Sequence, residues 1–457
     1  MKSLKINILL IALGAVLAGL SFTACEDYPD EYEVASGTPT VYYIRCLSTE
    51  VESSTDTDDT VYSTGQFVTS ASPQSVLCLV GENLRSVYEM YFNDKQAVLN
   101  SSYITDNTLI VAVPNSVPEE VSNLIYMITE KKDTVTYDFE VVIPAPTISS
   151  MSCEYAQPGT TATINGNYII DDPNVPLTIT FPDGSVAEDV DVDDSYASVS
   201  FTVPECYEEG PITVTSIYGS TESSFYYLDT RGMMFEFDGV TGLTNHGWHA
   251  RTITTDDTAI TGNFVQLGDG STTMDDSTWN DSQFSFEYWP GNYDDPLTYT
   301  EGSSIRLCDL VDFSDYTNMS IKFELYIPSE YPWSAGAMQI IMAGVDYVSY
   351  GNSGVYDVYG NLTAGCNNTY ISGDECPRAL YRPWTEDGSY DTGDEWVTVT
   401  IPISSSFLYG YSGGAATGSL SEDQFASLVI FVCSGGVSGT ECTPLFKIDN
   451  IRAVPNS

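Results

Sequence analysis

The sequence is poor in positive charge. Its 457 residues include 15 lysines and arginines against 64 aspartates and glutamates, so the formal net charge is −49 at pH 7. A surface with this balance repels nucleic acid and anionic lipid head groups, which excludes both as partners. A neutral partner such as a polysaccharide meets no such repulsion. Hydrophobic residues still make up 42% of the chain and aromatic residues 12%, which indicates folded domains rather than disorder.

Motifs for metal binding are also lacking. The sequence has no CxxC pair, and no third ligand stands beside His246 and His249. The acidic pairs at 275–276 and 294–295 could serve as glycosidase carboxylates or calcium ligands. With so many acidic residues, however, adjacent pairs are expected by chance. We therefore predict no metal, no cofactor and no catalytic residue.

Helical periodicity is scarce, and one short helical turn at 421–427 is the only candidate. Period-two alternation dominates instead, as in 319–327, where apolar Met319, Ile321 and Phe323 alternate with polar residues. Glycine, proline, asparagine and aspartate punctuate these runs. The pattern predicts an all-β chain of several antiparallel sandwiches.

Ten cysteines are present. Four of them lie inside apolar, strand-like runs and are predicted to be small core residues: Cys46, Cys78, Cys308 and Cys433. Cys366 with Cys376, or Cys433 with Cys442, could form a disulfide, because each pair flanks a loop. Spacing alone does not decide between them.

The N-terminus predicts export. Two lysines precede an uncharged apolar run at 6–20, and small residues lead to Cys25, so residues 1–24 are predicted to be a signal peptide. The run is too short to cross a bilayer of roughly 30 Å as a helix. A cysteine at the cut resembles a bacterial lipobox, and the acidic stretch 26–31 resembles the export signal of Bacteroidetes surface lipoproteins. This resemblance implies that Cys25 is acylated, with residues 25–37 as a tether.

Two segments share one order of features. Each has a turn with glycine and asparagine, an aromatic hairpin ending in aspartate and a strand ending in Val-Pro. The two glycines, Gly81 and Gly166, are 85 residues apart, and the two prolines, Pro114 and Pro204, are 90 residues apart. A nearly constant offset predicts duplicated domains, each one small sandwich.

With its Pro-containing entry steps, this order resembles the IPT/TIG immunoglobulin-like family. The resemblance implies tandem domains at 38–143 and 144–228 that act as spacers or interaction modules. The first copy carries an acidic, Ser/Thr-rich insertion around 50–60.

All six tryptophans fall in the remaining segment, 229–457. Flat aromatic rings on a rigid β scaffold suit the C–H faces of sugars, and each stack contributes on the order of 1 kcal/mol. Trp333 and Trp384 lie in Pro-containing, loop-like stretches, where functional residues are common. Trp289 and Tyr293 flank a third such stretch. We assign the other tryptophans, Trp248, Trp279 and Trp396, mainly to the core.

Together, the lipobox, the immunoglobulin-like repeats and the aromatic C-terminal segment resemble surface glycan-binding lipoproteins of Bacteroidetes, of the type whose C-terminal domain binds xyloglucan. The stretches 325–339 and 393–402 carry the match to that domain. The resemblance implies a jelly-roll-like β-sandwich at 229–457, with Trp333, Trp384 and Tyr381 in a glycan platform.

We therefore predict a non-enzymatic, lipid-anchored protein on the outer membrane that binds xyloglucan or another β-glycan. The family also implies that it feeds an outer-membrane importer and works beside surface glycanases. Two alternatives stay open at this point: a surface-anchored glycoside hydrolase, and a structural or adhesin-like lipoprotein.

Overall fold

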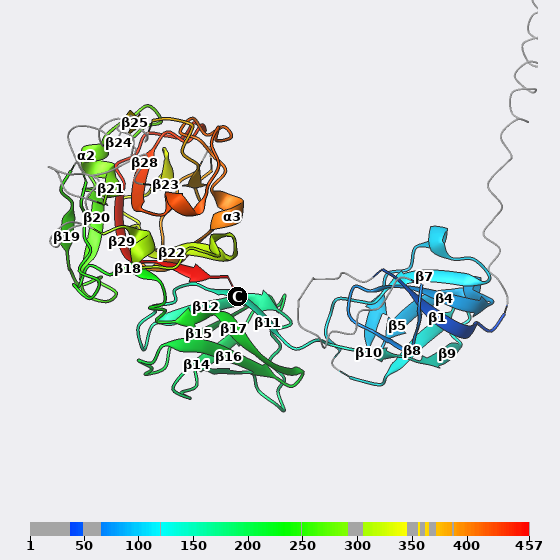
Figure 1. The fold of residues 1–457 in the computed structure, drawn as a ribbon. Helices are drawn as coiled ribbons and strands as arrows, with labels where there is room; N and C mark the ends of the chain where they lie inside the picture. Colours follow the sequence, from blue (N-terminus) through cyan, green and yellow to red (C-terminus); the bar gives the residue numbers. More distant parts are fainter. Residues whose placement is uncertain are drawn as a thin grey trace, which may run out of the picture. The chain divides into compact units, whose positions relative to one another are not determined.

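The computed structural model describes residues 37–48, 65–118, 120–247, 249–290, 305–344, 355–356, 362–364, 372–385 and 388–456. The chain divides into two compact units, the first ending at Pro144 and the second beginning at Ala145. Strands dominate both, as the alternation predicts (Figure 1). Within the described ranges, no helix is long and apolar enough to cross a membrane.

The first unit is an immunoglobulin-like sandwich of two four-stranded sheets. One sheet has the order β2 (Phe67–Val68), β1 (Thr40–Ser48), β4 (Val76–Glu82), β7 (Thr108–Ala112). The other has the order β6 (Lys95–Ala97), β5 (Val87–Phe92), β8 (Leu124–Thr129), β9 (Thr134–Asp138). A short parallel pair joins β3 (Ser70–Ala71) to β10 (Glu140–Val141). Alternate residues of β4 and β8 are buried between the sheets, which is the period-two burial of a strand.

The second unit begins with a smaller sandwich of the same kind. Its first sheet has the order β11 (Thr147–Met151), β12 (Thr161–Asn167), β15 (Ser198–Thr202), β14 (Glu188–Val192). Its second sheet has the order β13 (Thr178–Thr180), β16 (Gly210–Ser216), β17 (Gly219–Tyr227).

The rest of the second unit is a larger sandwich. One sheet has the order β19 (Thr252–Thr254), β20 (Phe264–Gly268), β29 (Leu445–Pro455), β22 (Met319–Tyr326), β27 (Val397–Pro402), and β18 (Met233–Phe235) also pairs with β29. The facing sheet has the order β21 (Ser285–Tyr288), β28 (Ser427–Cys433), β23 (Ala337–Ala343), β26 (Arg378–Tyr381). The remaining elements are small: the pair β24 (Val355–Tyr356) and β25 (Leu362–Ala364), and the helices α2 (Asp281–Phe284) and α3 (Ile403–Ser406). The helical turn expected at 421–427 is the 3₁₀ turn Glu422–Gln424.

The repeated glycine has the same structural role in both immunoglobulin-like domains. Gly81 faces Val41 on the entry strand, and Gly166 faces Ile148 in the matching position. A Cβ atom on Gly81 would collide with the carbonyl oxygen of Thr40, and one on Gly166 with that of Thr147. The glycine is therefore required by close strand contact, which explains why it recurs in the sequence.

The two sandwiches of the second unit are joined by a buried ion network. Arg452 on β29 contacts Glu154 of the smaller sandwich at 2.6 Å and Glu324 on β22 at 2.8 Å. Lys322 on β22 contacts the other oxygen of Glu154 at 2.5 Å. Thr398 binds the backbone N–H of Glu154 through its hydroxyl, at 2.7 Å. These contacts explain why β22, whose polar residues alternate as if facing water, is buried on both faces.

Two disulfide alternatives were left open by the sequence. Cys433 and Cys442 are free thiols, and the Cys442 sulfur accepts a hydrogen bond from the Ser334 N–H at 3.4 Å. The alternative in which Cys433 and Cys442 form a disulfide is therefore wrong. Cys366 lies outside the described residues. Of the four predicted core cysteines, Cys46 and Cys433 are buried and Cys78 and Cys308 are partly buried.

We predict that Gly166→Ala destabilises the second unit by about 1–3 kcal/mol, because the added methyl group overpacks the strand contact. Gly414→Ala is the matched control, since the nearest atom to its added Cβ is Ser412 Oγ, at an ordinary 3.6 Å. Urea unfolding followed by tryptophan fluorescence measures both. Equal stability of the two variants would contradict the assigned role of Gly166.

A second prediction concerns Asp449, a fully buried residue of β29 that accepts hydrogen bonds from the Thr261 hydroxyl and the Asn450 N–H, each at 2.8 Å. Burial raises the pKa of its carboxyl to about 8. The unfolded value is about 3.9, so the folded state binds this proton more tightly. Its stabilising contribution is complete below about pH 4 and is lost as the pH rises through about 8, a change of a few kcal/mol.

Asp449→Asn should therefore reduce the loss of unfolding free energy between pH 5 and pH 9 in urea titrations. Asp257→Asn, at an exposed aspartate of the same sandwich, serves as the control. An unchanged pH dependence in Asp449→Asn would rule out this carboxyl as its source.

Candidate functional site

The tryptophans predicted as ligand contacts are buried. Trp289 and Trp333 are 0% exposed and Trp384 is 3% exposed. A ring without an open face cannot stack on a sugar, so the ligand contacts predicted for these three indoles are corrected to structural roles. Tyr293 and Cys25 lie outside the described residues, as does Trp248.

The reason for this burial is a shared turn. The Trp333 indole N–H donates to the carbonyl of Ala335 at 2.7 Å, and the Trp384 indole N–H donates to Gly336 at 3.0 Å. Gly336 has a φ of +67°, a conformation that favours glycine. Two loops that are distant in sequence thus fold onto one turn and enclose their own aromatic rings.

Tyr381 also faces inward. Its cross-strand partner on β23 is Met338, whose side chain is fully buried between the sheets. Its ring lies 6.2 Å from that of Trp333, and burial, with Tyr390 beside it, raises the pKa of its phenol. Tyr381 is half-buried and forms part of the same structural cluster.

The exposed tryptophan at this end of the sandwich is Trp279. It is 40% exposed and lies in the loop before α2. Its ring packs edge-on against Phe431 of β28 at 5.0 Å and lies 5.8 Å from the half-buried ring of Tyr411. Trp279 and Tyr411, which we call the surface pair, thus rest on the outer face of the β21–β28–β23–β26 sheet.

Polar side chains are buried on the same sheet face. Gln339 is the cross-strand partner of Phe431, and its carboxamide oxygen accepts a hydrogen bond from Arg378 at 2.8 Å. Both residues are 0% exposed. Arg251 donates to the Ser285 hydroxyl at 2.7 Å on the neighbouring strand. Because Gln339, Arg378 and Ser285 are fully buried and paired within the protein, they order the sheet beneath the surface pair and do not themselves face a ligand.

The loop that carries Trp279 is held rigidly. The carboxylate of Asp275 accepts hydrogen bonds from the side chains of Ser277 and Thr278, at 2.8 and 2.9 Å, which lower its pKa. Asp276 accepts from the backbone N–H of Gly439 at 2.8 Å, and an added Cβ on Gly439 would meet the ring of Trp384. The loop that carries the exposed indole of Trp279 is therefore fixed to the segment that packs on the buried indole of Trp384.

Trp279 is exposed, so its assignment mainly to the core is wrong. A usable signal was present, because Trp279 is preceded by Asp275-Asp276-Ser277-Thr278 and followed by Asn280, with no apolar neighbour. This polar context indicates exposure better than the prolines that flank Trp333 and Trp384, which are buried.

The histidines have structural contacts. His249 contacts the Asp281 carboxylate at 3.2 Å, and a ring nitrogen of His246 lies 2.6 Å from the carbonyl oxygen of Trp289. Burial lowers the pKa of His246. Among the residues that the structure describes, no three His, Cys, Asp or Glu side chains are grouped to hold a metal ion.

Comparison with known proteins gives consistent matches. Residues 227–455 match the family model of the surface glycan-binding protein B xyloglucan binding domain. A crystal structure of a surface glycan-binding protein from Prevotella bryantii is 46% identical, with a TM-score of 0.74, over 93% of this chain and 100% of that one.

An IPT/TIG domain-containing protein of Bacteroides ovatus is 28% identical over 239 residues, or 49% of this chain. The matched region spans 45% of that relative's own length.

Proposed function

The chain belongs to the surface glycan-binding protein B family, and from this membership we propose that it captures xyloglucan or a related β-glycan at the bacterial surface without cleaving it. The observation that carries the proposal is the surface pair, an exposed tryptophan and a partly exposed tyrosine fixed on a rigid sheet. The fold is the predicted one, with tandem immunoglobulin-like domains before a larger β-sandwich.

Binding without cleavage fits the acidic pair at 275–276. A glycosidase needs a carboxylic acid whose raised pKa keeps it protonated, together with a second carboxylate. The hydrogen bonds to Asp275 lower its pKa instead, and its neighbour Asp276 anchors a loop through Gly439. The other acidic pair, 294–295, lies outside the described residues.

Location and partners complete the proposal. Cys25 would carry the lipid anchor in the outer membrane, with residues 25–37 as a tether and the first immunoglobulin-like domains as spacers. A captured chain would then pass to surface glycanases and an outer-membrane importer. Tyr293 remains a predicted contact.

We predict that Trp279→Ala weakens binding to xyloglucan about five- to tenfold, since one lost ring stack removes on the order of 1 kcal/mol. Affinity gel electrophoresis on xyloglucan and mixed-linkage glucan measures the loss. Tyr88→Ala is the control, because Tyr88 is 63% exposed but lies in the first unit. Unchanged retardation of Trp279→Ala would remove the surface pair from the site. Retardation by no glycan in the panel would favour the adhesin-like alternative.

A further prediction separates capture from hydrolysis. Prolonged incubation of the purified protein with xyloglucan, mixed-linkage glucan and mannan should release no reducing sugar above a protein-free blank. Release that grows with protein concentration would establish the hydrolase alternative instead.

A further inference from the structure

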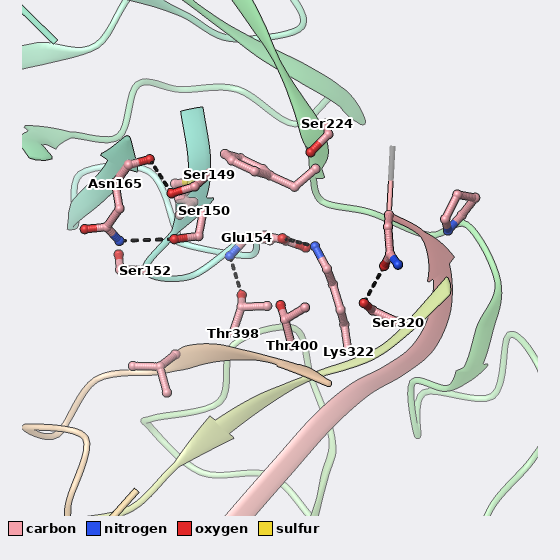
Figure 2. Close-up of a pocket in the computed structure, with 15 residues that line it drawn as sticks. Ser149, Ser150, Ser152, Glu154, Asn165, Ser224, Ser320, Lys322, Thr398 and Thr400 are labelled. Atoms are coloured by element: carbon pink, nitrogen blue, oxygen red, sulfur yellow. Dashed lines mark hydrogen bonds and ion pairs between the residues drawn. The ribbon is translucent and has the colours of Figure 1, made fainter. Parts of the chain in front are cut away.

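A cavity of about 450 Å³ lies inside the second unit, where the smaller sandwich meets the larger one. One wall comes from β11, β12 and β17 of the immunoglobulin-like domain, and the other from β22, β27 and the end of β29. Figure 2 shows the side chains of both walls pointing toward one another. We call this cavity the seam pocket.

The floor of the seam pocket is charged but balanced. Lys322 and Glu154 line it, 8% and 2% exposed, and form the ion pair that Figure 2 marks. The second oxygen of Glu154 contacts Arg452, which in turn contacts Glu324. Two cations thus face two carboxylates, so this pocket is locally neutral in a protein whose formal charge is −49. Neither an anion nor a cation finds an uncompensated partner there.

The rim of the seam pocket is built from hydroxyl and amide groups. The amide of Asn165 donates to the Ser150 hydroxyl at 3.2 Å, which fixes two of these groups in place. Ser224 on β17 and Thr400 on β27 line the pocket from opposite walls, and both are exposed. No hydrogen bond links either hydroxyl to another described residue. These groups can both donate and accept, as the hydroxyls of a sugar do.

The size and the rigidity of the seam pocket also indicate a ligand site. A volume of 450 Å³ falls within the roughly 300–1,000 Å³ that ligand pockets occupy. The polar lining does not suit an apolar ligand, and the overall acidity of the chain disfavours an anionic one. The buried ion network holds the two walls together, so the pocket is formed before any ligand arrives.

We propose that the seam pocket is a second saccharide site, which binds a neutral sugar unit of the captured glycan or of a free oligosaccharide. The proposal rests on the proposed function for its ligand class, but its residues come from the smaller sandwich and from the other sheet of the larger one, and none belongs to the surface pair. Glycan contact then involves the second immunoglobulin-like domain, which would be more than a spacer.

The test is isothermal titration calorimetry of the full mature chain with cellobiose and a xyloglucan-derived heptasaccharide. We expect two independent sites. Ser224→Tyr should weaken one of them at least tenfold by filling the pocket, while Trp279→Ala should weaken the other. Ser220→Tyr is the matched control, since Ser220 is exposed on the same strand but does not line the pocket.

Thr400→Tyr repeats the experiment from the opposite wall, should Ser224→Tyr fail to fold. Hydrogen–deuterium exchange gives a second measure, because the heptasaccharide should protect peptides that cover 147–152 and 396–402. A single binding site that neither Ser224→Tyr nor Thr400→Tyr weakens, with no protection of these peptides, would overturn the proposal for the seam pocket. The proposed function would then still stand. Absence of binding to both probes would overturn both.

Discussion

The ion network around Glu154 is the constraint on which the second unit depends. One carboxylate of the immunoglobulin-like domain binds both Lys322 and Arg452 of the larger sandwich, and Arg452 is held from its other side by Glu324. Arg452 is 0% exposed. Removing one member of a buried group of this kind costs about 3–5 kcal/mol, because it leaves a charge without compensation. The network therefore specifies how the two sandwiches meet.

The fixed arrangement of the two sandwiches also allows hydrogen bonds between them. The backbone N–H of Thr398 donates to the carbonyl of Ser152 at 2.8 Å, and the hydroxyl of Tyr155 donates to that of Asp229 at 2.6 Å. Hydrogen bonds of this kind need partners in constant register, which the buried charges provide. The seam pocket exists for the same reason, since two separately moving domains would not keep a cavity of constant shape.

Much of the fold was predictable from short-range pattern. Alternation identified strands such as β15, of which one face is buried, and the recurrence of Gly81 and Gly166 marked two equivalent strand contacts. Burial of Lys322 and Glu324 was not predictable in this way. Their alternation is that of a strand with one face in water. Glu154, the residue of the covering domain that pairs with Lys322, lies 168 residues earlier. The local sequence pattern of a strand contains no information on a distant domain that packs against it.

The site shows the same limit in its tryptophans. Proline near Trp333 and Trp384 correctly indicated loops, but a loop is not necessarily exposed, and these two fold back onto the turn at Gly336. Their burial has a mechanical effect, because the Gly439 segment that packs on Trp384 also holds Asp276, three residues before Trp279. An exposed indole on a loose loop would lose conformational entropy on binding each sugar. Here the buried tryptophans restrict the loop beforehand, so the exposed one is already ordered when a glycan arrives.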